Sequence, residues 1–206
     1  QIKIAYIDIE VGSENGFPSV ENASEVVTAI TLKIGKNCYV FGCGDYQHDR
    51  EDVFYLKCSS ERALLEKFFK MWDKESPDIV TGWNIDTFDI PYLVNRAKRL
   101  FDEKRNPYRL LSPWRRLREY IMYGLGGREL QTYEIYGVET LDYLALYRKF
   151  TYINQESYRL DHIANVELGE SKLDYSEQGT LHLLYKNDYQ KFIKYNIKDV
   201  ELVEQL

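Results

Sequence analysis

Two carboxylates near the amino terminus follow a pattern that could bind a cation. Asp8 and Glu10 alternate with apolar residues in KIAYIDIEV, residues 3–11, a run typical of a β-strand. Residues i and i+2 of a strand share a face, so both carboxylates point the same way, about 7 Å apart along the strand. Beside apolar residues such a pair is unfavourable unless a cation neutralises it. Taken alone, the pair also fits an edge strand whose polar face is in water.

Three further oxygen-bearing residues add to this pattern. Asp89 precedes Ile90 and Pro91 at a predicted helix start, where it could cap the helix or bind a metal. Tyr195 and Asp199 lie four residues apart on a predicted last helix and so share a face, although alone they fit an ordinary helix contact. They flank the predicted buried stripe of that helix, which is Phe192, Ile193, Ile197, Val200 and Val203. Carboxylates without histidine suit Mg²⁺ or Mn²⁺. Two such ions about 4 Å apart can activate a water and stabilise a leaving oxygen in phosphodiester hydrolysis.

The elements that must position these residues follow from periodicity and turn residues. Three strands after the first are expected to continue it as an antiparallel meander: 27–34, 38–42 and 53–57. Ser60 is a predicted N-cap of a helix that ends at Pro77 and whose buried face is Leu64, Leu65, Phe68, Phe69 and Trp72. The remaining expected elements are a strand at 78–82, a helix at about 90–101, a loop at 102–118, a β-hairpin at about 117–136, and helices at 141–150, 158–166 and 188–206. Together they predict an α/β fold with a mixed sheet flanked by helices.

Length and composition bound the class of protein. The chain has 206 residues, which predicts one domain, and its start at Gln1 directly before a strand suggests a domain of something longer. With 27 basic and 33 acidic residues the net charge is −6, so bulk charge alone cannot hold nucleic acid. No apolar run reaches the roughly 20 residues of a membrane helix. Three cysteines and three histidines without zinc-type spacing favour a reduced intracellular protein.

Three ordered motifs resemble the 3′→5′ proofreading exonuclease domain of family B DNA polymerases, with most similarity to T-even-like bacteriophage enzymes. IAYIDIEV resembles the first exonuclease motif, TGWNIDTFDIPYLVNR at 81–96 the second, and YNIKDVELV at 195–203 the third. The segments 141–150 and 157–175 also follow the family pattern, so that the resemblance covers nearly the whole chain. It implies a ribonuclease H-like fold.

The resemblance also implies roles at the site. Asp8, Glu10, Asp89 and Asp199 would hold two Mg²⁺ or Mn²⁺ ions, and Tyr195 would orient the attacking water or the scissile phosphate. A related subclass has histidine where this chain has Lys194, which indicates the tyrosine (DEDDy) type.

Three substrate-binding residues are implied by the same resemblance. Phe17 would stack against the 3′-terminal bases, unless it is a core or loop-anchoring residue. Asn84 would bond the strand being cut, unless it caps its loop. Lys172 would steady a phosphate or a carboxylate, unless it is a surface lysine.

The resemblance extends to partners. The family hairpin is implicated in separating primer from template, and here its predicted tip, GLGG, is richer in glycine. The sequence has no S-L-Y-P-S-like or D-T-D-S-like polymerase motif, so palm, fingers and thumb are expected elsewhere in the same chain or in a companion chain. Further implied partners are a single-stranded DNA 3′ end and a sliding clamp, without a membrane, in the cytoplasm (of the host cell for a viral protein).

Two other functions stay open at this point. One is a free-standing exonuclease of the same class that acts on RNA or short oligonucleotides. The other is a catalytically inactive module that binds single strands or docks partners.

Overall fold

The central sheet has six strands in the order β4-β3-β2-β1-β5-β8. The computed structural model describes residues 2–12, 16–124, 127–170 and 181–206, and all ranges below refer to these. The sheet strands are β1 Ile4–Val11, β2 Val27–Ile34, β3 Asn37–Gly42, β4 Val53–Lys57, β5 Ile79–Gly82 and β8 Glu139–Asp142. β1, β2 and β3 pair antiparallel, whereas β5 runs parallel to both β1 and β8. The expected mixed sheet is therefore present.

Two features of this sheet differ from expectation. β4 pairs parallel with β3, so the meander prediction is wrong for its last strand; residues 43–52 carry the chain back before β4 begins, and a hydrophobic pattern does not encode strand direction. β8 was not predicted, and its last two residues, 141 and 142, were expected to begin a helix. Its last residue, Asp142, also caps the following helix by accepting a hydrogen bond from the Ala145 amide at 3.2 Å, so the strand has no separating turn.

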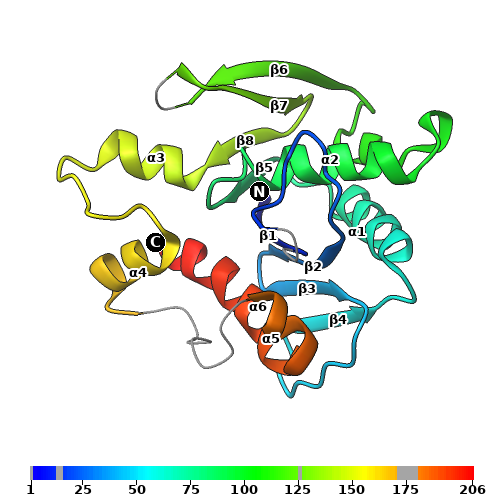
Figure 1. Ribbon diagram of the computed structural model, residues 1–206, viewed down its shortest axis with the longest axis horizontal. Coiled ribbons are helices and arrows are strands. Elements are labelled where there is room, and N and C mark those ends of the chain that lie inside the picture. Colours follow the sequence, from blue (N-terminus) through cyan, green and yellow to red (C-terminus); the bar gives the residue numbers. More distant parts are fainter. Residues whose placement is uncertain (1, 13–15, 125–126, 171–180) are drawn as a thin grey trace.

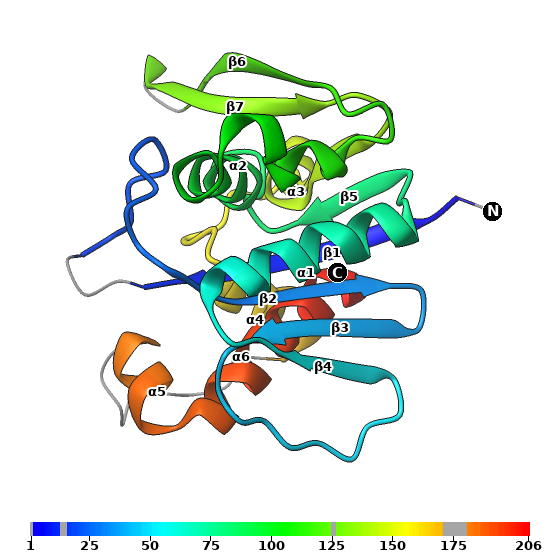
Figure 2. The ribbon, with the colours of Figure 1, turned by 90° about the vertical axis from the view of Figure 1, so that its right-hand side faces the viewer.

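Helices cover both faces of the sheet (Figures 1 and 2). Their bounds are α1 Glu61–Glu75, α2 Asp89–Leu100, α3 Tyr143–Phe150, α4 Leu160–Leu168, α5 Leu181–Asn187 and α6 Tyr189–Gln205, with 3₁₀ turns η1 Glu103–Arg105 and η2 Pro107–Leu111. One hydrophobic core joins α1 and α2 to one face of the sheet. A second core joins α5 and α6 to the other face. α5 had not been predicted.

Local signals explain α1 and α6. Ser60 caps α1 by accepting a hydrogen bond from the Ala63 amide at 3.3 Å, and its buried residues are the five expected ones. The expected apolar stripe of α6 is likewise buried: Phe192, Ile193, Ile197, Val200 and Val203. α6 is thereby held across β1 and β2, which fixes where its polar residues lie.

A second, two-stranded sheet lies beyond α2, away from the main sheet (Figure 2). β6 Leu117–Tyr123 and β7 Glu129–Ile135 pair antiparallel, from Leu117 with Ile135 to Tyr123 with Glu129. Tyr133 of β7 donates a hydrogen bond to Asn95 of α2 at 2.6 Å. The tip residues 125 and 126, part of the predicted glycine-rich turn, lie outside the described residues.

Candidate metal centre

The first two carboxylates project from β1 toward α6. Ala5, Ile7 and Ile9 are buried in the core on the α1–α2 side, so strand alternation turns Asp8 and Glu10 to the opposite face. Glu10 is only 7% exposed, and Asp8 is half-buried. β1 has a neighbouring strand on each side, so Asp8 and Glu10 do not lie on a solvated edge strand.

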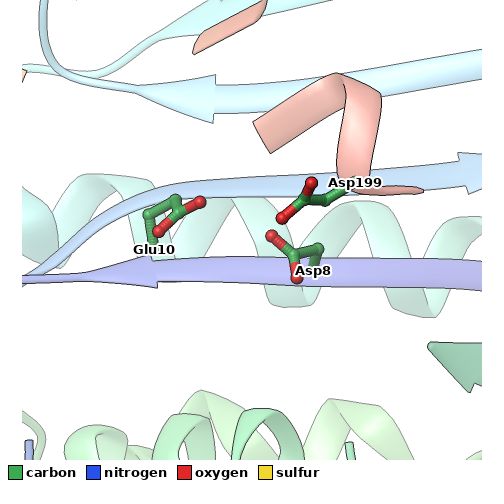
Figure 3. Close-up of side chains that lie close together, drawn as sticks. All are labelled: Asp8, Glu10 and Asp199. Atoms are coloured by element: carbon green, nitrogen blue, oxygen red, sulfur yellow. The ribbon is translucent and has the colours of Figure 1, made fainter. Parts of the chain in front are cut away.

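α6 brings a third carboxylate to this pair. Asp199 is buried, and one oxygen of each of Asp8, Glu10 and Asp199 lies within 4.8 Å of the others. Figure 3 shows the three carboxylates converging between β1 and α6. Three close carboxylates repel one another and raise each other's proton affinity unless a cation lies among them. The all-oxygen donor set fits a hard divalent ion such as Mg²⁺ or Mn²⁺.

A buried asparagine holds Asp8 in place. Asn196 of α6 is fully buried, and its Nδ2 donates to Asp8 Oδ2 at 2.6 Å. Its Oδ1 accepts a hydrogen bond from the Thr31 hydroxyl of β2 at 2.5 Å. This chain of hydrogen bonds fixes both the rotamer of Asn196 and the carboxylate that it contacts. Sequence reasoning missed Asn196; the available signal was an amide within the buried stripe, three residues before Asp199.

Asp89 lies behind β1, as the first residue of α2. Its Oδ1 accepts a hydrogen bond from the Ile9 amide at 3.0 Å. Ile9 lies in the part of β1 that follows Tyr6, the last β1 residue paired with β5. The pKa of Asp89 is raised to about 7, mainly by burial and in smaller part by the nearby charges of Asp142 and Asp199, while the hydrogen bond from the Ile9 amide lowers it. Asp89 is not one of the three carboxylates whose oxygens converge, and it binds the backbone between Asp8 and Glu10. Asp89 does not occupy the N-cap position of α2, which is Phe88.

Tyr195 lies one turn before Asp199 on α6, and its side chain is 6% exposed. The i, i+4 spacing puts both side chains on the same helix face. The predicted pair therefore stays together at the edge of the buried stripe.

Phe17 is at the surface, with 88% of its side chain exposed. Its ring centroid lies 5.5 Å from that of Phe88, and Phe88 in turn stacks on Tyr92 at 5.5 Å. Phe17 is thus not a core residue. It lies against the residue that precedes Asp89, with most of its ring free for a ligand.

Asn84 makes a hydrogen bond within its own loop. Its φ of 67° is in the left-handed region, which asparagine tolerates better than most residues. Its Oδ1 accepts a hydrogen bond from the Thr87 hydroxyl at 2.5 Å. Lys172 lies outside the described residues.

Asp142, which sequence reasoning also missed, organises the same loop. Its two carboxylate oxygens accept hydrogen bonds from the backbone amides of Asn84, at 3.2 Å, and Asp86, at 3.0 Å. The pKa of Asp86 is raised to about 7, mainly by burial and in smaller part by the charges of Asp142 and Glu139. The motif around Asp89 is therefore shaped by a residue more than 50 positions later.

The family model for "DNA polymerase family B, exonuclease domain" matches residues 1–163. This chain belongs to that family. The DNA-directed DNA polymerase of Escherichia phage RB69 is 35% identical over 234 aligned positions, which take in all of this chain and 25% of the phage protein. That of Enterobacteria phage T4 is 32% identical, again with 100% of this chain and 25% of the phage protein. The DNA polymerase catalytic subunit of Alcelaphine herpesvirus 1 is 28% identical, with coverages of 100% and 21%.

The match to an exonuclease domain agrees with a metal centre at the carboxylate cluster. The chain spans about a quarter of the length of the curated phage relatives that it matches. Exonuclease domains of this family use divalent metal ions, and the acidic cluster could bind one. Within the described ranges, no helix is both long enough and apolar enough to cross a bilayer.

Proposed function

We propose that this exonuclease domain hydrolyses the terminal phosphodiester of single-stranded or frayed DNA in the 3′→5′ direction, with two divalent ions. In this proposal it is the proofreading part of a DNA-directed DNA polymerase in the host-cell cytoplasm, with a ribonuclease H-like fold of the DEDDy type. The polymerase domains belong to the same or a companion chain, and a sliding clamp is a further partner.

The observation that supports this best is the convergence of Asp8, Glu10 and Asp199. Their oxygens lie within 4.8 Å of one another, although β1 and α6 are at opposite ends of the chain. Burying these carboxylates together is unfavourable without a cation. A scaffold that only binds single strands has no physical use for them.

Each side chain has a role in the proposed reaction. When bound, two ions would supply an activated water and stabilise the leaving 3′ oxygen. Asp8, Glu10 and Asp199 would hold them, with Asp89 as the fourth carboxylate once its side chain leaves the Ile9 amide. Tyr195 would orient the water or the scissile phosphate.

The remaining predicted residues would position the DNA strand. The exposed ring of Phe17 would stack on a terminal base, while the Asn84 amide and Lys172 would contact the strand being cut. The β6–β7 pair would correspond to the family hairpin implicated in separating primer from template. A mismatched end frays more readily, so it would enter the site more often than a paired one.

The test is digestion of a 5′-labelled single-stranded oligodeoxynucleotide with Mg²⁺ or with EDTA. The double variant Asp8→Ala, Glu10→Ala removes the β1 pair. Asp49 and Glu51 form a second D-x-E on an exposed loop, so Asp49→Ala, Glu51→Ala removes the same charge elsewhere. We expect a ladder that shortens from the 3′ end in the wild type and in the loop variant, and no ladder in EDTA or in the β1 variant.

The other functions predict different results. Faster cleavage of the matching oligoribonucleotide would support the RNA-directed alternative. Absence of cleavage together with absence of metal-dependent thermal stabilisation would support the inactive module. Equal loss of activity in both double variants would contradict the proposed metal centre.

A further inference from the structure

A second candidate ligand site lies at the base of the β6–β7 sheet. There, a cavity of about 490 Å³ is lined by arginines from η2, from the segment before β6 and from β6 itself, together with Tyr136 just after β7. The four arginines are Arg109, Arg115, Arg116 and Arg118. The cavity shares no residue with the carboxylate cluster, and nothing in the proposed reaction uses it.

Two of these arginines help to build the cavity wall. Arg115 forms a two-pronged ion pair with Asp73 of α1, at 2.6 and 2.9 Å. Arg118 pairs with Glu134 across the β6–β7 ladder at 2.8 Å. Ion pairs of this kind fix the orientation of a guanidinium more than they add stability.

The other two arginines carry uncompensated charge. Arg109 and Arg116 are exposed, and neither forms an ion pair with a carboxylate in the described part of the chain. The Arg116 guanidinium lies 5.2 Å from the centre of the Tyr136 ring. Glu119, the acidic residue in the lining, is paired with Lys98 at 3.1 Å. The cavity is therefore locally positive in a chain whose net charge is −6.

The chemistry of the lining favours a phosphate ligand. Guanidinium groups bind phosphate oxygens through two parallel hydrogen bonds. Phosphate contacts supply most of the affinity of proteins for nucleic acid. Trp114, which precedes Arg115 in the chain, is 67% exposed, and it offers a surface on which a base can stack. The family model is that of a DNA polymerase exonuclease domain, so DNA is the polyanion that we consider as the ligand.

We propose that the cavity at the base of β6–β7 binds backbone phosphates of a single DNA strand, through Arg109 and Arg116. This second site would hold the strand away from the carboxylates. It would also contribute affinity for DNA, because the rest of the domain has a net negative charge that opposes DNA binding. The inference goes beyond the proposed nuclease function and does not depend on it.

The test measures binding of a fluorescent single-stranded oligodeoxynucleotide by anisotropy, in EDTA and over a range of salt concentrations. Arg109→Gln, Arg116→Gln removes the two free cations. Lys36→Gln, Lys70→Gln is the control, because it removes the same charge from exposed positions outside the cavity. Melting temperatures of both variants establish that they are folded.

We expect the arginine variant alone to bind more weakly. Its slope of log K against log salt should fall by about 1.4, because each phosphate contact on a single strand contributes about 0.7. The double variant Arg109→Lys, Arg116→Lys keeps both positive charges but loses the two parallel hydrogen bonds that each guanidinium can donate. It should therefore keep the salt slope and bind DNA with an intermediate affinity. Cleavage of a substrate too short to reach the cavity should be unchanged, which separates this site from the nuclease site.

Three outcomes would overturn the proposal. Both double variants could lose affinity and slope equally, which would indicate bulk charge. The arginine variant could bind DNA as the wild type does. Poly-glutamate could compete with DNA as strongly as an unlabelled oligonucleotide does, which would indicate an acidic protein partner.

Discussion

The carboxylate cluster and the arginine cavity are built from opposite charges in opposite surroundings. Asp8, Glu10 and Asp199 come from distant parts of the chain and converge between the main sheet and α6. The arginines of the cavity come from residues 109–118 and remain exposed to water. Burial makes the close carboxylates unfavourable unless a cation neutralises them. The arginines are solvated, so their charge costs little even without a ligand. A chain of net charge −6 can thus contain a local site for a polyanion.

The largest expected effect comes from removing the charge that α6 brings to the cluster. Asp199→Asn should lower the exonuclease rate by roughly a thousandfold, since about 4 kcal/mol of metal-based transition-state stabilisation is at stake. In EDTA its melting temperature should be unchanged or higher, because one of three mutually repelling carboxylates is gone. Single-turnover rates and thermal melts measure the two. A large fall in melting temperature in EDTA would mean that Asp199 serves folding.

A smaller effect is expected when the support of the cluster is removed. Asn196→Ala should lower Mn²⁺ affinity about 10- to 100-fold, as is usual for groups that orient metal ligands. Asn95→Ala is the matched control, because Asn95 is also a buried amide and bonds Val20 and Tyr133. Both should lose similar stability, and calorimetric titration with Mn²⁺ tells them apart. Equal Mn²⁺ affinity in the two would make Asn196 purely structural.

Phe17 belongs to neither region, because its side chain is exposed and carries no charge. Phe17→Ala should raise KM for a single-stranded substrate about tenfold, because one stacked base is worth about 1–3 kcal/mol, with no change in melting temperature. Phe54→Ala is the control: Phe54 is also exposed and in ring contact, 5.6 Å from Tyr39. Steady-state kinetics of both variants decide the matter, and equal KM values would remove Phe17 from the binding site.

The smallest effect concerns stability near the cluster. Burial raises the pKa of Asp86 to about 7, so its ionised form destabilises the folded state at pH 8. Asp86→Asn should therefore stabilise the protein by about 1–2 kcal/mol at pH 8. The gain should shrink as the pH falls from 7 and vanish near 4, where the unfolded state is also protonated. Urea unfolding against pH measures it, with exposed Asp49→Asn as the control; a gain independent of pH would contradict this cause.

Elements with strong periodicity could be predicted from the sequence. The buried faces of α1 and α6 were both predicted, because apolar spacing alone sets which face packs. The direction of β4 and the existence of β8 could not, since strand pairing depends on where the chain returns rather than on local pattern. Asp142 shows the difficulty most clearly: one residue ends a strand, caps a helix and organises a loop.

The site was predicted in outline. Alternation along β1 and spacing on α6 indicated Asp8, Glu10 and Asp199, and the structure brings them together. The hydrogen bond from the Ile9 amide to Asp89 and the link from Thr31 through Asn196 to Asp8 could not be predicted. Both join residues far apart in sequence, and their geometry exists only after the sheet and helices have packed.

The central claim is that the buried carboxylates form a divalent-metal site, and Mn²⁺ titration followed by electron paramagnetic resonance tests it directly. The three samples are the wild type, the β1 double variant with Asp8→Ala and Glu10→Ala, and the loop double variant with Asp49→Ala and Glu51→Ala. We expect saturable Mn²⁺ binding in the wild type and in the loop variant, and none in the β1 variant. Mn²⁺ binding of the same strength in all three proteins, or in none, would contradict the account.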